Sequence, residues 1–145
     1  MKRALVDVNV WLSLLVRQHR HHGIALQWYD ALGTSEAGIC RFVQLSLIRL
    51  LGNRSVMNEH AIAAGAAWSL IEELAEDERV EFVPEPTDLD RILPALLRYP
   101  VLTGKLVNDA YLAAFAMSSS RRLVTLDTGY RQFRGLDLEI LGSTL

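Results

Sequence analysis

Short apolar segments alternate along this chain with longer stretches of helical periodicity. Uninterrupted apolar segments predict four buried β-strands, at residues 3–7, 80–83, 122–127 and 138–141. Amphipathic spacing predicts helices over residues 9–17, 22–32, 40–51, 59–76 and 107–118. The strands lack the period-two alternation of a half-exposed antiparallel sheet, so we expect both of their faces to be covered. The pattern therefore predicts an α/β fold with a central, mainly parallel β-sheet flanked by α-helices.

Local signals predict where some of these helices begin and end. Gly33 follows the segment 22–32 and is typical of the glycine just past a helix C-terminus. The stretch TDLD (87–90) resembles a capping box with Thr87 as the N-cap, and we expect the helix that it opens to stop before Tyr99-Pro100. The tryptophans stand at helical spacing among apolar neighbours and are predicted to lie in the core: Trp11, Trp28 and Trp68.

Composition narrows the class of protein. With 145 residues, half of them hydrophobic, residues 1–145 are expected to form one domain around a single core. The apolar runs are too short to cross a bilayer, so no contact with a membrane is expected. The lone cysteine, Cys40, excludes an internal disulfide and a cysteine-based zinc site, and is typical of a cytoplasmic protein.

The charge balance excludes nucleic-acid binding by bulk electrostatics, because the net charge is -2. An RNA substrate would need a local basic patch, a metal ion or a partner. Candidate residues for such a patch are Arg17, His19, Arg20, His21, His22, Arg41, Arg49, Arg54 and Lys105. Within it, the adjacent histidines of HRHH (19–22) are interpreted as a solvated turn, since neighbouring side chains in a loop cannot all face one ion.

Three acids stand where the pattern otherwise predicts buried structure. Asp7 and Asp127 each end a predicted strand, and Asp109 lies in the first turn of an apolar helix. Ligands of open α/β sheets bind beyond the carboxyl ends of the strands, so we expect these acids to meet at one rim. Their mutual repulsion would be relieved by a cation, and oxygen ligands without cysteine favour Mg²⁺ or Mn²⁺.

Each acid also has a structural interpretation. Asp127 could cap the short segment TGYRQF, and Asp109 could interact favourably with the helix dipole. Asp7 is the hardest to explain in this way, because burying a carboxylate without a partner is costly. Asn9, two residues further on, places a second polar group where core is expected.

Taken together, LVDVNVWL near the start, VNDAYLAAFA and LVTLDTGYRQF resemble the PIN-domain ribonucleases, specifically VapC-type toxins of type II toxin–antitoxin systems. The resemblance covers nearly the whole chain and implies a PIN-like α/β domain that cuts RNA as an endoribonuclease with Mg²⁺, or Mn²⁺ as a substitute. It also implies a cognate antitoxin and a homodimer. By position, Asp7, Asp109 and Asp127 match metal-binding, catalytic acids of the family, and the polar residues that accompany these acids match Asn9 and Thr125.

Gln44 departs from the family pattern, because the family commonly has a glutamate in the corresponding helix. A glutamine there removes a negative charge, which favours one tightly held ion, with a second arriving alongside the RNA phosphate. The resemblance then implies attack by a metal-activated water, with one carboxylate accepting its proton. Alternatively, Gln44 is a helix residue that is hydrogen-bonded within the core.

Two other functions stay open. A catalytically weakened PIN-like binding module would account for Gln44. A phosphatase of the haloacid dehalogenase type is distantly suggested by DVNVW, but Asn9 and Trp11 replace the second aspartate and the threonine that its loop requires. Apolar faces of the helices predicted over 9–17, 22–32 and 40–51 are expected to bind an antitoxin segment or a second copy of the chain.

Overall fold

A single parallel sheet organises the protein, whose computed structural model describes residues 2–99 and 102–142. Its strands are β1 (Ala4–Val6), β2 (Ala37–Ile39), β3 (Val80–Phe82), β4 (Arg122–Thr125) and β5 (Leu138–Ile140). They lie in the order β3-β2-β1-β4-β5, and every neighbouring pair is parallel. This confirms the predicted α/β class.

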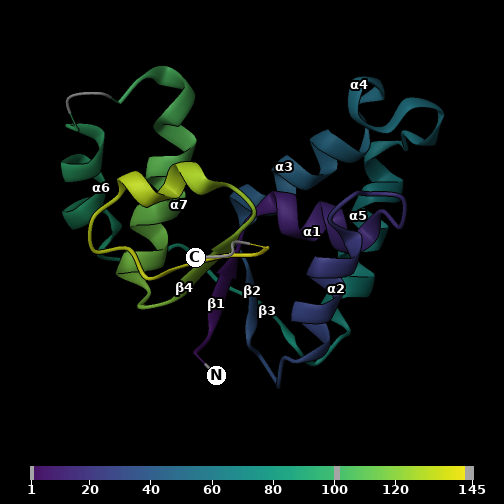
Figure 1. Ribbon diagram of the computed structural model, residues 1–145, viewed down its shortest axis with the longest axis horizontal. Coiled ribbons are helices and arrows are strands. Elements are labelled where there is room, and N and C mark those ends of the chain that lie inside the picture. The colour runs from purple at the N-terminus through teal and green to yellow at the C-terminus, as the bar shows by residue number, and fades with distance from the viewer. Residues whose placement is uncertain (1, 100–101, 143–145) are drawn as a thin grey trace.

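The connections between strands place helices on both faces of the sheet. Between β1 and β3 the chain forms α1 (Val8–Leu15), α2 (His22–Asp30), α3 (Arg41–Leu51), α4 (Arg54–Met57), the 3-10 turn η1 (Asn58–His60) and α5 (Ala64–Ala75). After β3 it forms α6 (Leu89–Leu97), η2 (Gly104–Leu106), α7 (Val107–Ser118) and, beyond β4, η3 (Thr128–Gln132). Figure 1 shows α1, α2, α3 and α5 on one side of the sheet and α6, α7 and η3 on the other.

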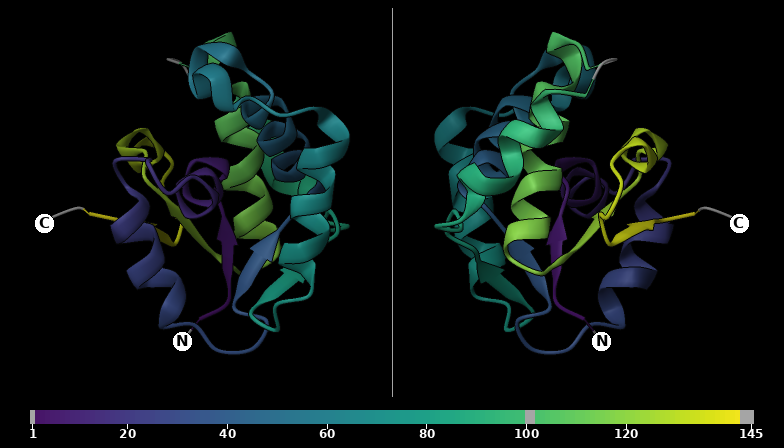
Figure 2. Two further views of the ribbon diagram at one scale, coloured as in Figure 1. Left: turned by 90° about the vertical axis from the view of Figure 1, so that its right-hand side faces the viewer. Right: turned by 90° about the vertical axis from the view of Figure 1, so that its left-hand side faces the viewer.

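The order of the strands determines where a site can form. From β1 the chain moves outward to β2 and β3, then returns to place β4 on the other side of β1. The direction of the connections therefore reverses between β1 and β4, which is where open α/β sheets bind ligands. The strands run in the same direction, so their carboxyl ends meet at one edge (Figure 2).

Central strands and helix faces supply the core. The side chains of β1 are buried throughout, and Trp11 on α1 is fully buried with its indole Nε1 donating to the Val6 carbonyl oxygen at 3.2 Å. Trp28 is partly buried and packs against this core. The prediction that Trp68 lies in the core is wrong, because this residue of α5 is 38% exposed. Its ring lies beneath the guanidinium of Arg41.

Several predicted boundaries differ from the structure. The helix predicted over 59–76 begins only at Ala64, because residues 58–60 form the 3-10 turn η1. Helix α2 ends at Asp30 with Ala31 as its C-cap, so Gly33 is not the glycine next to the cap. Asp88, not Thr87, precedes α6, and neither completes a capping box. That helix ends before Tyr99 as predicted, while Pro100 lies outside the described residues.

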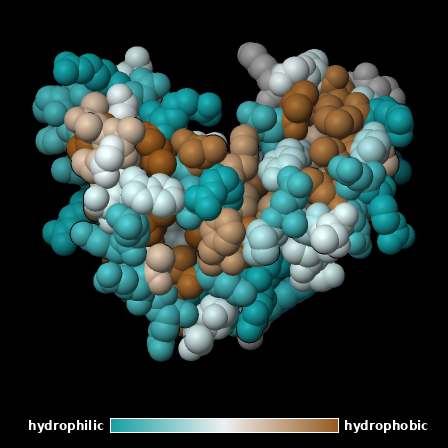
Figure 3. Space-filling model, turned by 180° about the vertical axis from the view of Figure 1, so that it is seen from behind, coloured by the Kyte–Doolittle hydropathy of each residue, from teal (hydrophilic) through white to brown (hydrophobic). Residues whose placement is uncertain are grey.

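A groove of about 600 Å³ lies between α3 on one side and α6 and α7 on the other, and the exposed apolar side chains of Leu45, Leu97 and Val107 contribute to it. Its lining residues are Arg41, Phe42, Leu45, Glu85, Leu93, Leu97, Val107, Asn108 and Tyr111. Figure 3 shows this face of the molecule, with hydrophobic side chains on both sides of a hollow. No helix in the described part of the chain is long and apolar enough to cross a membrane.

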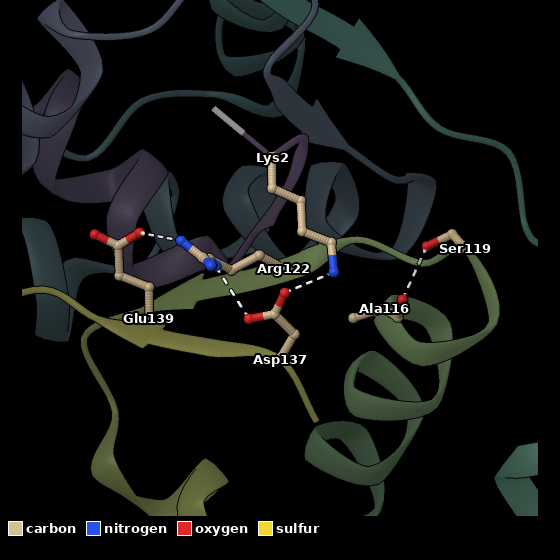
Figure 4. Close-up of polar contacts among 6 residues, drawn as sticks. All are labelled: Lys2, Ala116, Ser119, Arg122, Asp137 and Glu139. Atoms are coloured by element: carbon tan, nitrogen blue, oxygen red, sulfur yellow. Dashed lines mark hydrogen bonds and ion pairs between the residues drawn. The ribbon is translucent and has the colours of Figure 1, made fainter. Parts of the chain in front are cut away.

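Ion pairs tie the outer strand β5 to its neighbours. Arg122 on β4 contacts Asp137 at 3.0 Å and Glu139 at 3.8 Å, and Lys2 contacts Asp137 at 2.6 Å (Figure 4). These side chains are partly exposed, so water and salt screen the pairs and each contributes little to stability. The contacts to Lys2 and Arg122 hold the pKa of Asp137 below its ordinary value.

Candidate active site

Asp7 lies directly after β1 and begins α1 as its N-cap. Its Oδ1 accepts a hydrogen bond from the Val8 backbone N–H at 2.7 Å, and its Oδ2 accepts one from the Thr125 hydroxyl at 2.7 Å. The residue is only 5% exposed. The hydrogen bonds stabilise the buried carboxylate and fix its orientation.

Thr125, the last residue of β4, connects Asp7 to the rest of the site. Its hydroxyl donates to Asp7 and accepts from the Asn9 side-chain amide at 3.3 Å and from the Asp127 backbone N–H at 3.0 Å. The Asn9 Oδ1 in turn accepts from the Leu126 backbone N–H at 3.2 Å. All three hydrogen-bonding positions of the fully buried hydroxyl are therefore used. Thr125 therefore contacts Asp7 directly, whereas Asn9 is connected to Asp7 through Thr125.

Replacing Thr125 with valine tests this network. We expect Thr125→Val to destabilise the protein by about 1–3 kcal/mol, because buried polar groups lose their partner. Thr125→Ser retains the hydroxyl and serves as the control, which should lose less stability than the valine variant. Urea unfolding of the two variants and the wild type measures the difference. A serine variant that loses as much stability as the valine variant would contradict the prediction, because the methyl group would then contribute as much as the hydroxyl.

Asp109 and Tyr130 meet across the same edge of the sheet. Asp109 is half-buried in the first turn of α7, as predicted, and its Oδ1 accepts from the Tyr130 hydroxyl at 3.3 Å. Tyr130 is a buried residue of η3 that the sequence analysis did not select. The available signal was its position in the short segment TGYRQF, which Asp127 was expected to cap.

Asp127 has the capping role that one interpretation of the sequence predicted. It is the N-cap of η3, and its Oδ1 accepts from the Gly129 backbone N–H at 2.8 Å. The residue is exposed, unlike Asp7. Its charge nevertheless acts on both other acids. Asp127 can therefore cap η3 and belong to the group of acids at the same time.

The three acids lie close enough for their charges to act on one another. Burial raises the pKa of Asp7 to about 6, although its hydrogen bonds oppose this, and the charges of Asp109 and Asp127 raise it further. Burial and the charge of Asp127 also raise the pKa of Asp109. Burial raises the pKa of Tyr130 far above its ordinary value, and the charges of all three acids raise it further. Among the side chains that the structure describes, no lysine, arginine or histidine forms an ion pair with these acids.

Gln44 contacts residues outside the group of acids. Its Oε1 accepts from the Arg41 guanidinium at 2.7 Å, and its side chain lines a cavity with Ile71 of α5 and Phe82 of β3. Phe42, two residues earlier on α3, instead contacts the ring of Tyr111 on α7 at 5.4 Å. Residues two apart on a helix point about 200° apart, so Phe42 and Gln44 face different neighbours. The contacts described for Gln44 do not include Asp7, Asp109 or Asp127, and its hydrogen bond to Arg41 agrees with the hydrogen-bonded alternative.

Comparison with known proteins identifies the family. Residues 4–136 match the family model of the PIN domain. Ribonuclease VapC41 of Mycobacterium tuberculosis is 34% identical over 142 residues, which cover 94% of this chain and 97% of the relative. Ribonuclease VapC29 of the same organism is 33% identical over 137 residues, covering 94% of each chain. The chain therefore belongs to the PIN-domain family, within its VapC-type ribonucleases.

Solved structures agree on the fold. DNA-bound VapBC from Salmonella typhimurium superposes with a TM-score of 0.67 at 18% identity, over 97% of this chain and 98% of that one. VapC20 of Mycobacterium tuberculosis, described as a sarcin-ricin loop cleaving toxin, gives 0.63 at 18% identity, over 89% of this chain and 93% of that one. Membership of the PIN-domain family sets aside the phosphatase alternative.

Proposed function

We propose that this protein is a Mg²⁺-dependent endoribonuclease and the toxin of a toxin–antitoxin pair. The observation that supports this most directly is the group formed by Asp7, Asp109 and Asp127, which share one electrostatic field without an ion-pair partner in the described structure. The names of the relatives support RNA as the substrate. We also propose a cytoplasmic location, since the lone Cys40 is buried as a free thiol.

The chemistry of these side chains fits a hard divalent cation. Carboxylate oxygens are the ligands that Mg²⁺ and Mn²⁺ prefer, and a cation between them would relieve the repulsion that raises their pKa values. Within the described residues, no three histidine, cysteine or acidic side chains are already arranged to hold a metal ion. We therefore expect the exposed Asp127 to turn toward Asp7 and Asp109 when an ion binds.

In the proposed mechanism Asp7 and Asp109 have different roles. A bound Mg²⁺ would polarise the scissile phosphate and acidify the attacking water. Asp7, held by Thr125 and the Val8 N–H, provides a carboxylate of fixed orientation. Asp109 is the better proton acceptor, because both carboxylate oxygens of Asp7 already accept hydrogen bonds. Its Oδ1 accepts from Tyr130, so we assign the proton to Oδ2.

We also propose which surfaces bind the antitoxin and a second copy of the chain. Structural neighbours include DNA-bound VapBC and a toxin–antitoxin complex from Klebsiella pneumoniae. We assign the cognate antitoxin to the apolar surface between α1 and α2, where Leu14, Leu15 and Leu26 surround a hollow. We assign the second copy of a homodimer to the groove between α3 and α6–α7. That groove carries both Arg41 and Glu85, so a twofold axis could pair one with the other across the interface.

We assign the contacts with RNA phosphates to basic side chains near the edge of the sheet and on the helices around it. Of the candidates for a basic patch, the exposed arginines are Arg17, Arg20, Arg41, Arg49 and Arg54. The side chain of Lys105 lies outside the described residues. Contacts of this kind position an RNA backbone without selecting its sequence.

The experiment that tests the proposal is cleavage of structured RNA by the purified protein. We expect cutting with Mg²⁺, loss of cutting with EDTA, recovery with Mn²⁺, and inhibition by the cognate antitoxin. Asp109→Asn should abolish cutting, whereas Asp137→Asn, in the ion pairs of β5, should leave it unchanged. Failure to cut under all conditions, with intact antitoxin binding, would favour the binding module.

A further inference from the structure

The hydroxyl of Tyr130 lies among the three acids. The ring is 1% exposed and packs against Phe133 with centroids 6.2 Å apart, so the side chain is anchored in the core. Its hydroxyl donates to Asp109 Oδ1 at 3.3 Å. Tyr130 also belongs to the 3-10 turn that Asp127 caps.

We propose that Tyr130 is a positioning residue, whose hydroxyl holds the Asp109 carboxylate toward Asp7 and Asp127 and thereby strengthens metal binding. The inference rests on the proposed function and assigns a role to a residue that no sequence motif indicated. Tyr130 acts through Asp109 and is not itself assigned as a metal ligand.

Two observations distinguish this role from simple packing. A phenylalanine would fill the same apolar space, so packing alone does not explain a buried hydroxyl that needs a partner. Its acceptor is one member of a group of like charges, which repel each other in the absence of a cation. Without the donor, Asp109 would be free to rotate away from the other acids. An ion would then have to restrict the carboxylate on binding and would bind more weakly.

The test compares Tyr130→Phe with Tyr99→Phe. The control makes the same chemical change near the same ring, because Tyr99 packs against Phe133 with centroids 5.7 Å apart. Its hydroxyl, however, accepts from the Arg134 backbone N–H at 3.3 Å, whereas the Tyr130 hydroxyl donates to a carboxylate. Both variants and the wild type would be examined by calorimetric titration with Mn²⁺, by kcat and KM for RNA cleavage, and by thermal unfolding in EDTA.

We expect Tyr130→Phe to weaken Mn²⁺ binding by about 10- to 100-fold, the usual cost of removing a partner that orients a ligand. At a fixed, subsaturating metal concentration kcat should fall, while the KM for RNA should stay near the wild-type value. Tyr99→Phe should change neither the Mn²⁺ affinity nor kcat. Thermal unfolding in EDTA checks that both variants are folded.

The outcomes separate this inference from the proposed function. Wild-type Mn²⁺ affinity in a folded Tyr130→Phe protein would overturn the positioning role and leave the nuclease proposal intact. An equal loss of affinity in both variants would also overturn it, because the effect would then come from the packing around Phe133. A wild-type protein that binds no Mn²⁺ would overturn both proposals.

Discussion

Replacing Asp7 with asparagine should abolish RNA cleavage and at the same time make the metal-free protein more stable. Cleavage is lost because the best-ordered carboxylate of the site loses its charge. Stability rises because burial raises the pKa of Asp7 to about 6 from an ordinary value of 3.8, so the charged form is disfavoured in the folded state. An asparagine oxygen can still accept from the Val8 N–H and keep the cap.

The sign of the effect sets its pH dependence. A folded-state pKa above the unfolded value destabilises the protein once the group is ionised in both states. The penalty is therefore complete above about pH 6, shrinks as the pH falls from 6 toward 4, and is absent below the unfolded pKa. A shift of this size corresponds to a penalty on the order of 2–3 kcal/mol for a buried group. We expect the free energy of unfolding of Asp7→Asn to exceed that of the wild type by up to that amount at pH 8.

Urea unfolding in EDTA at pH 5 and pH 8 measures this gain. Asp137→Asn is a control of opposite sign, because Lys2 and Arg122 hold the pKa of Asp137 below its ordinary value. The loss of stability in Asp137→Asn at neutral pH should be small, since the ion pairs of Asp137 are partly exposed. An Asp7→Asn protein less stable than the wild type at pH 8 would show that hydrogen bonds to the carboxylate outweigh its desolvation.

The candidate site was predictable where a residue's role depends on its position in a short local pattern. Asp7 follows an apolar strand and Asp109 opens an apolar helix, so both could be placed at one edge of the sheet once the fold class was known. The contacts of Gln44 could not be predicted in this way. The face that a residue of α3 presents depends on how the helix packs against α1 and α5, which is a tertiary property.

Tyr130 was missed for a related reason. A tyrosine among apolar neighbours is usually interpreted as core, and its ring is indeed buried. Only the 3-10 turn that begins at Asp127 brings its hydroxyl toward the acids. The strand β2 was missed because its residues, Ala37-Gly38-Ile39, include two with little strand propensity. Its conformation depends on pairing with β1 and β3 rather than on local preference.

Gly38→Ala should be the most damaging small substitution in the sheet. A Cβ at Gly38 would lie 2.5 Å from the Ala4 carbonyl oxygen and 2.8 Å from both Arg121 Nη1 and Val83 Cγ2. The first of these is a backbone atom of the neighbouring strand and cannot move aside without disturbing β1. The guanidinium of Arg121 is also held, because it donates to the Ala4 carbonyl oxygen at 3.1 Å.

We expect Gly38→Ala to lower the free energy of unfolding by about 3 kcal/mol, a value at the upper end for overpacking. Gly65→Ala on α5 is the matched control, since a Cβ there meets nothing within 4 Å. It should instead stabilise the protein by about 0.5–1 kcal/mol through helix propensity and a less flexible unfolded chain. Urea unfolding compares the two variants. If Gly38→Ala were as stable as Gly65→Ala, β1 and β2 would have to separate at little cost. The close contact between those strands would then not limit which residues β2 can contain.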